Sequence, residues 1–114
     1  MLFRSWYRST EAVSRGVRYS YDAYQGTFDG RVGIWAIPLQ PTLASKELLL
    51  ELKKFADETG AGLCMHSNYD PAEVELCLRE TGKRPIELLE SIGILDKNLV
   101  LVHEIGRASC RERV

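Results

Sequence analysis

Three short apolar runs alternate with helix-like segments, and this alternation limits the fold more than any other feature of the sequence. The runs occupy residues 31–37 (RVGIWAI), 61–66 (AGLCMH) and 98–103 (NLVLVH). Strands that are apolar on both faces are typical of parallel sheets covered by helices. We therefore predict an α/β chain of right-handed βαβ units with three parallel strands at these positions.

The segments before and between the first two runs carry helix signals. Large apolar or aromatic residues recur at helical spacing up to Tyr24, and Gly26 is expected to end this first helix. Ser45 is expected to cap a second helix that continues to Thr59. The core-facing stripe of that second helix is predicted to be Leu48, Leu52, Phe55 and Ala56.

The helix that follows the second run has the clearest start signal. Asp70 is expected to be the N-cap, Pro71 takes the first helical position, and Glu73 places an acidic group in the first turn. A further helix is predicted from Pro85 to about residue 92, because a glycine follows at 93. The core-facing residues of the helix that begins at Pro71 are predicted to be Val74, Cys77 and Leu78.

Composition and charge exclude several classes of protein. The chain is 45% apolar and 27% charged, which is typical of a soluble globular protein, and its net charge of −1 gives no sign of nucleic-acid binding. No apolar run approaches the roughly 18 residues of a membrane helix, and the first residues lack the apolar core of a signal peptide. The three cysteines have no C-x-x-C spacing. We expect them to be reduced and the protein to be cytoplasmic.

The last eleven residues, EIGRASCRERV at 104–114, do not resemble an evolved sequence. Apart from the first base, their back-translation matches a widely used sequencing adapter read in frame. We expect this tail to be non-native, so that Glu104 and Cys110 carry no functional argument. Residues 1–103 are then expected to be one piece of a longer protein.

Both histidines of the chain, His66 and His103, stand at the end of an apolar run. In parallel barrels, side chains at the carboxyl ends of the strands converge on one pocket, and an imidazole there can bind a metal. The alternative is that each histidine only completes a hydrogen bond at a strand end. A catalytic zinc needs at least three protein ligands, and the sequence offers no obvious third.

Five motifs in order carry a resemblance to a known family. A strand ends in His66; Glu73-Val74 opens the next helix; GKRPIEL and GIL follow at 82–88 and 93–95; and VLVH closes the series at 100–103. This order and spacing resemble the amidohydrolase superfamily, most closely the branch of cytosine and guanine deaminases and triazine chlorohydrolases. The resemblance covers roughly residues 30–103, and residues 1–29 fit the preceding helix loosely.

The resemblance implies that residues 1–103 are part of a (β/α)8 TIM barrel, from the helix before the fourth strand through the sixth strand. It implies a metal-dependent hydrolase of carbon–nitrogen bonds other than peptide bonds, deaminase-like or chlorohydrolase-like, with zinc or iron as its divalent metal. His66 is implied as a metal ligand. His103 is implied as the catalytic residue at the metal-bound water or substrate, and as a second possible ligand. The expected substrate-pocket residues are Ser67, Asn68 and Tyr69.

One departure from the family pattern concerns Tyr69. Deaminases of this branch carry a glutamate there as a proton shuttle, and a phenol with a pKa near ~10 shuttles protons poorly at neutral pH. Nucleobase deamination is therefore in doubt, whereas hydrolysis of another C–N bond or of a C–Cl bond stays open. The alternatives are a small non-enzymatic α/β binding domain and an amidohydrolase paralogue that has lost catalysis.

The family pattern also requires residues that this chain does not contain. A His-x-His pair on the first strand and an aspartate on the eighth are both missing, so the chain alone is expected to be inactive. For the complete protein we expect a small-molecule substrate and no nucleic-acid or membrane partner. A homo-oligomer is possible for the complete protein.

Overall fold

The computed structural model describes residues 9–104, and within them helices lie before and between two strands, where three strands were predicted. The helices α1 and α2 come first, and then a long extended segment leads to η1, α3 and the first strand. Two further helices separate the first strand from the second. The elements are α1 (Thr10–Tyr24), α2 (Thr27–Gly30), η1 (Pro41–Leu43), α3 (Lys46–Thr59), β1 (Leu63–His66), α4 (Pro71–Thr81), α5 (Pro85–Ser91) and β2 (Leu99–Val102).

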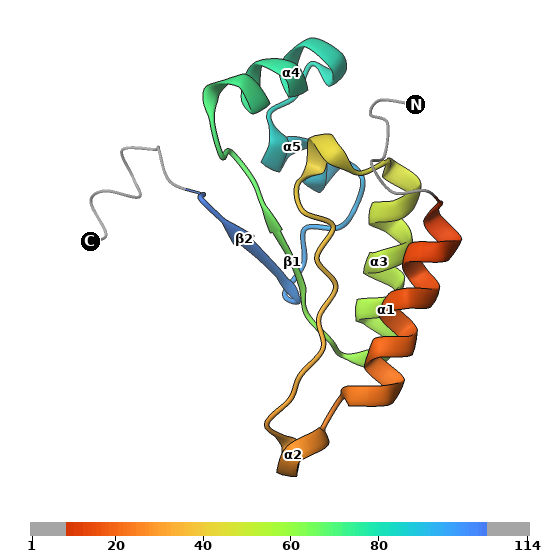
Figure 1. Ribbon diagram of the computed structural model, residues 1–114. Helices are drawn as coiled ribbons and strands as arrows, with labels where there is room; N and C mark the ends of the chain where they lie inside the picture. Colours follow the sequence, from red (N-terminus) through yellow and green to blue (C-terminus); the bar gives the residue numbers. More distant parts are fainter. Residues whose placement is uncertain (1–8, 105–114) are drawn as a thin grey trace, which may run out of the picture.

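The strands β1 and β2 pair in parallel, with Leu63 opposite Leu99 and His66 opposite Val102. Both strands therefore finish at the same edge of the sheet, and α4 lies at that edge in Figure 1. Between the strands the chain passes through α4 and α5 and returns to the start of β2. A crossover of this kind is what a parallel strand pair requires.

The predicted strand at 31–37 is only an extended segment that joins the sheet at a single residue. Ala36 forms an isolated parallel bridge with Leu63. The N–H of Ala36 donates to the carbonyl of Gly62 at 3.1 Å, and the N–H of Cys64 donates to the carbonyl of Ala36 at 2.9 Å. The described residues thus contain two parallel strands rather than three, with the extended segment beside β1.

Local chemistry explains why this segment does not extend the sheet. Pro38 has no N–H to donate to a neighbouring strand, and Leu39 turns the chain with a φ of 70°. The apolar run is also not buried on both sides, since Trp35 is 52% exposed and Ile37 is 59% exposed. The carbonyl of Leu39 still accepts the backbone N–H of His66 at 2.7 Å, which holds the segment beside the end of β1.

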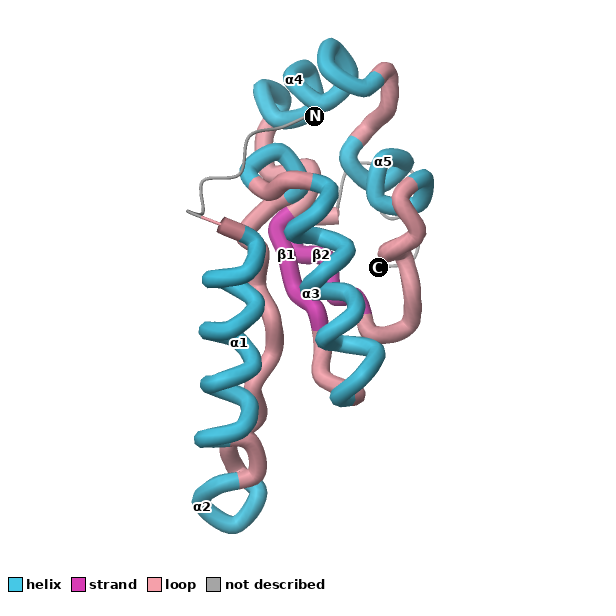
Figure 2. Tube along the Cα trace, turned by 90° about the vertical axis from the view of Figure 1, so that its right-hand side faces the viewer, coloured by secondary structure: helices cyan, strands magenta, loops and turns pink. Residues whose placement is uncertain are grey.

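The main core lies between the sheet and the helices α1 and α3, which Figures 1 and 2 show on one side of the strands. The predicted stripe of α3 is confirmed, because Leu48, Leu52, Phe55 and Ala56 are at most 1% exposed. From β1, Leu63 and Met65 enter the same core. Burying one such side chain contributes about 1.5–3 kcal/mol.

The outer helix α4 departs from its predicted pattern at one position. Cys77 is fully buried and Val74 is half-buried, but Leu78 is 40% exposed, so its predicted core position is wrong. Helix α4 packs mainly against α5 and η1, and Cys77 packs with Leu88 of α5. Because α4 packs against the rest of the protein on one side only, Leu78, the residue after Cys77, faces solvent.

The predicted helix ends are confirmed. The Ser45 hydroxyl accepts the N–H of Leu48 at 3.1 Å, and the Asp70 carboxylate accepts the N–H of Glu73 at 2.9 Å. Helix α3 ends at Gly60, whose φ of 76° suits glycine. These caps fix where α3 and α4 begin relative to β1.

Further sequence predictions concern the cysteines, the C-terminal tail and membrane-spanning segments. Cys64 and Cys77 are free thiols, as expected, whereas Cys110 and nearly all of the predicted adapter tail lie outside the described residues. Within residues 9–104, no helix combines the length and the apolar character that crossing a bilayer demands.

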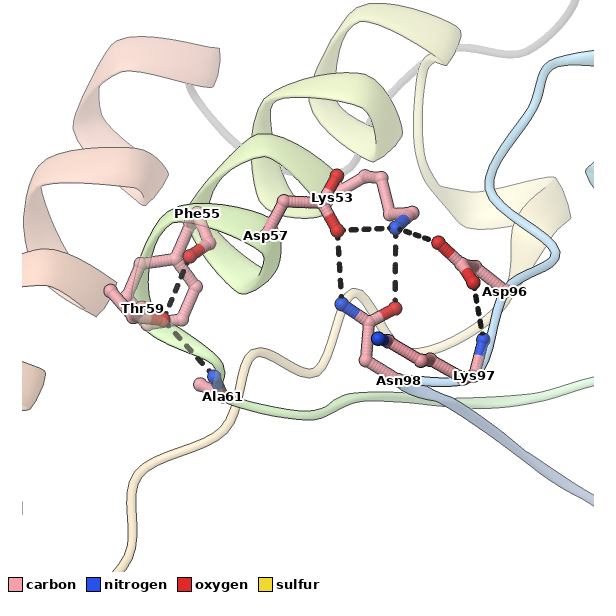
Figure 3. Close-up of polar contacts among 8 residues, drawn as sticks. All are labelled: Lys53, Phe55, Asp57, Thr59, Ala61, Asp96, Lys97 and Asn98. Carbon is pink, nitrogen blue, oxygen red and sulfur yellow. Dashed lines mark hydrogen bonds and ion pairs between the residues drawn. The ribbon is translucent and has the colours of Figure 1, made fainter.

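A polar cluster joins α3 to the chain just before β2 (Figure 3). The Lys53 ammonium, on a side chain only 9% exposed, donates to Asp57, to Asp96 at 3.0 Å and to Asn98 at 3.3 Å. Burial alone would lower the pKa of Lys53, but the hydrogen bonds to the two carboxylates outweigh burial and raise it. The same hydrogen bonds lower the pKa values of Asp57 and Asp96.

Replacing Lys53 by methionine is expected to lower the free energy of unfolding by about 1–3 kcal/mol, because charge-assisted hydrogen bonds are lost. Urea unfolding followed by tryptophan fluorescence measures this loss. Lys54→Met is the matched control, since Lys54 is 64% exposed and its ion pair with Glu58 spans 4.0 Å. The loss in free energy of unfolding caused by Lys53→Met, relative to the control, should be present at neutral pH. It should fade as the pH falls through the lowered carboxyl pKa values or rises through the raised pKa of Lys53.

Candidate functional site

Strained backbone marks the edge of the sheet where the parallel segments finish. Leu39, Asn68 and His103 each have a positive φ, of 70°, 54° and 73°. They follow, in turn, the extended segment, β1 and β2. A left-handed conformation costs a residue such as Leu39 or His103 roughly 1–2 kcal/mol, whereas asparagine adopts it readily. Positive φ also occurs away from this edge, at Phe28 and Asp29 of α2.

The same edge brings the two histidines together. His66 is the last residue of β1 and His103 directly follows β2. Their rings are stacked with centroids 5.0 Å apart and an angle of 21° between the ring planes. His66 is half-buried and His103 is exposed. The convergence expected for side chains at the carboxyl ends of parallel strands is therefore present.

Tyr69 extends this group of rings. Its ring meets that of His103 edge to face, with centroids 5.4 Å apart, while 61% of the residue is exposed. The turn between β1 and α4 thus places an aromatic surface next to the imidazole of His103. Aromatic pairs of this geometry contribute about 0.5–1.5 kcal/mol beyond their buried area.

The other two predicted pocket residues differ in their surroundings. Ser67 is fully buried, and its backbone N–H donates to the carbonyl of Val102 at 3.0 Å. Asn68 is half-buried and donates its side-chain amide to Glu104 at 2.6 Å. Glu104 belongs to the segment predicted to be adapter-derived, so we assign it no role.

Buried polar atoms without a hydrogen-bond partner are confined to this edge in the described part of the chain. They are Nδ1 of His66, Oγ of Ser67, and one carboxylate oxygen each of Glu73 and Glu104. Leaving a buried polar group unpaired costs about 1–3 kcal/mol, so proteins rarely do so without a reason. With Glu104 set aside, the atoms of His66, Ser67 and Glu73 are therefore candidates for binding a ligand or a metal.

Glu73 is the residue that the sequence analysis missed as part of the site. It was interpreted as a favourable charge at the start of α4, yet the residue is only 5% exposed. Burial raises the pKa of Glu73; the Tyr69 N–H and His66 act against this, whereas the charges of Asp70 and Glu104 add to it. The only feature of the sequence that could have placed Glu73 in the site is its position one helical turn after the turn at residues 67–69.

The donor set fits part of a metal centre. Nδ1 of His66 is a buried nitrogen without a partner, as a metal ligand would be, and His103 brings a second imidazole alongside. Among residues 9–104, no group of three or more His, Cys, Asp and Glu side chains could hold a metal ion. A catalytic zinc needs at least three protein ligands, so the described residues do not form a complete zinc site by themselves.

Comparison with curated proteins identifies relatives that are deaminases. The chain is 32% identical over 85 residues to the 5′-deoxyadenosine deaminase of Methanobrevibacter smithii; the match covers 75% of this chain and 20% of that protein. It is 41% identical over 68 residues to the 5-methylthioadenosine/S-adenosylhomocysteine deaminase of Aquifex aeolicus, covering 60% and 16% of the two chains. The chain spans about a fifth of the length of these relatives. No protein-family model matches the chain.

Comparison with solved structures finds the same arrangement of elements. An adenosine deaminase from Xanthomonas campestris with bound zinc superposes with a TM-score of 0.80 at 18% identity, covering 97% of this chain and 25% of that one. Atrazine chlorohydrolase from Arthrobacter aurescens, complexed with zinc, gives a TM-score of 0.78 at 21% identity, covering 87% and 22%. The chain therefore has the fold of one part of these larger hydrolases.

Proposed function

We propose that the chain is an internal segment of a metal-dependent amidohydrolase that hydrolyses carbon–nitrogen bonds other than peptide bonds. In this proposal, residues 1–103 supply the fourth to sixth strand positions of the barrel, and residues 104–114 are not native. The observation that carries the proposal is the meeting of both histidines with unpartnered buried polar atoms at the carboxyl edge of parallel strands. The deaminase relatives support the reaction class.

Each site residue has a distinct task in this proposal. His66 would hold the metal through its ring, with His103 beside it at the same face. A bound divalent metal, zinc or iron, would supply an activated water at neutral pH. His103 is exposed, so it can reach that water or the substrate and move a proton. Tyr69 would cover one side of the bound substrate with its aromatic ring.

The substrate class follows from the surroundings of the histidines. A planar, nitrogen-containing ring suits a site lined by the rings of Tyr69 and His103 and by buried polar atoms. The relatives act on adenosine-type nucleosides, so the first substrates to test are 5′-deoxyadenosine and related aminated purine nucleosides. The presence of Tyr69 instead of a glutamate makes C–Cl hydrolysis of a chlorotriazine the second substrate class to test.

The experiment requires the complete protein that contains this segment. We would purify it, measure its metal by elemental analysis, and assay ammonia or chloride release from aminated purine nucleosides and chlorotriazines. We expect about one or two divalent ions per chain and turnover of a C–N substrate that a chelator abolishes. A complete protein with neither metal nor turnover would support the degenerate paralogue instead.

The 114-residue chain by itself is expected to bind zinc only weakly and to show no turnover. Two imidazoles without further ligands cannot hold zinc tightly, so we expect a Kd weaker than about 1 μM. Titration calorimetry with zinc chloride measures it. A Kd of micromolar or tighter would mean that the described residues form a complete metal site, which contradicts the proposed division of the barrel.

A further inference from the structure

One carboxylate oxygen of Glu73 makes a structural hydrogen bond, and the other makes no hydrogen bond in the described structure. Its Oε2 accepts the backbone N–H of Tyr69 at 2.7 Å, and its own N–H donates to the Asp70 carboxylate at 2.9 Å. The Asp70 contact is an ordinary N-cap, whereas in a full capping box the Glu73 carboxylate would accept the N–H of Asp70 instead of that of Tyr69. These contacts account for Oε2 but leave Oε1 buried without a partner.

A comparison within the chain shows that capping does not require such burial. Glu87 occupies the equivalent place in the first turn of α5, where it accepts the backbone N–H of Arg84 at 3.0 Å. Glu87 is nevertheless exposed to solvent, whereas Glu73 is 5% exposed. The burial of Glu73 is therefore a separate feature that costs stability without helping the helix start.

The Glu73 carboxylate lies against the turn that follows β1, because its Oε2 accepts the backbone N–H of Tyr69 there. Ser67 and His66, from the end of β1 and the turn after it, each contribute another buried polar atom without a partner. A carboxylate is a pure acceptor, and a serine hydroxyl can accept or donate. The complementary group is a hydrogen-bond donor, and the aromatic rings of Tyr69 and His103 favour one carried on a planar ring.

We propose that Glu73 is a substrate-binding residue, whose Oε1, assisted by Ser67 Oγ, accepts a hydrogen bond from the exocyclic amino or ring N–H group of a planar nitrogen heterocycle. This inference rests on the proposed function, because it assigns the substrate to the same site. It gives the site a carboxylate one helical turn beyond Tyr69.

The test compares Glu73→Gln with Glu87→Gln in the complete protein. Glutamine keeps an oxygen for the helix cap but turns the other end of the group into a donor, so only the contact with a ligand N–H is lost. The probes are 5′-deoxyadenosine and an amino-1,3,5-triazine, and their Kd values are measured by calorimetry on metal-free protein, where no turnover interferes. We expect Glu73→Gln to weaken at least one Kd by tenfold or more, and Glu87→Gln to change both by less than twofold.

Ser67→Ala provides a second variant in case Glu73→Gln does not fold. It removes only a buried hydroxyl that has no partner in the described structure, so we expect normal folding and a Kd that is several-fold weaker. For the zinc-loaded enzyme, Glu73→Gln should retain its metal content and lose kcat/KM. Metal retention separates this substrate-binding role from that of a metal ligand.

Three results would overturn the inference about Glu73. The first is unchanged binding in Glu73→Gln, the second is an equal effect of Glu73→Gln and Glu87→Gln, and the third is a wild-type protein that binds neither probe. A wild-type protein that binds a probe but never turns it over would refute the proposed reaction and leave the binding role of Glu73 intact. The two proposals can therefore fail separately.

Discussion

Replacing His66 by alanine in the complete protein is expected to remove bound metal and activity together. His66 ends a paired strand, its backbone N–H is held by the carbonyl of Leu39 at 2.7 Å, and its Nδ1 is buried without a partner. A nitrogen presented so rigidly suits a metal ligand. We expect metal content to fall by at least tenfold and turnover to reach background.

Cys64→Ala is the matched control for this experiment. Cys64 lies two residues earlier on β1, so its side chain is on the same face as His66, and it is half-buried as well. We expect this variant to keep its metal and most of its rate. If His66→Ala retained full metal and full rate, His66 would be no more than a hydrogen-bonding residue at a strand end, and the central claim would be wrong.

Features set by neighbouring residues could be predicted from the sequence. The caps at Ser45 and Asp70 depend on contacts three residues apart, so the composition of each short stretch decides them. The meeting of His66 and His103 was also predictable in outline, because parallel strands finish at one edge. Their stacked geometry was not, since it depends on the positive φ of His103.

Features that depend on distant partners were missed or wrong. The run at 31–37 has the composition of a strand, but pairing needs a neighbour along its whole length, and Pro38 and Leu39 end the contact after Ala36. Glu73 looked like an ordinary first-turn carboxylate, and Glu87 has the same sequence context. Only the tertiary position of the start of α4, where Glu73 lies against the turn after β1, distinguishes the buried glutamate from the exposed one.

The polar cluster around Lys53 was likewise invisible in the sequence. Its partners Asp96 and Asn98 lie more than 40 residues along the chain. They come together only because α3 packs beside the segment that enters β2. This cluster lies before β2, whereas the histidines lie at the ends of the strands. The polar cluster and the proposed site thus lie at opposite ends of the strands (Figures 1 and 3), the division between stability and chemistry that parallel barrels show.

Replacing His103 by alanine in the complete protein should have a different outcome from the loss of His66. His103 is exposed and follows β2 in a strained conformation, so it suits a group that reaches the water or the substrate. We expect His103→Ala to keep most of its metal and to lose about 10²–10⁴-fold in kcat, the usual contribution of a positioned acid–base group. Elemental analysis and turnover on the best substrate measure the two effects.

His103→Gly separates the chemical role of this histidine from the strain of its backbone. Glycine adopts a φ of 73° without a steric penalty, so the glycine variant should be at least as stable as His103→Ala, by up to about 1 kcal/mol, and should lose the same rate. A large loss of metal in both variants would instead make His103 a ligand of equal standing with His66. Full activity in either variant would remove His103 from the chemistry, because a proton cannot be moved at neutral pH by a side chain that has no titratable group.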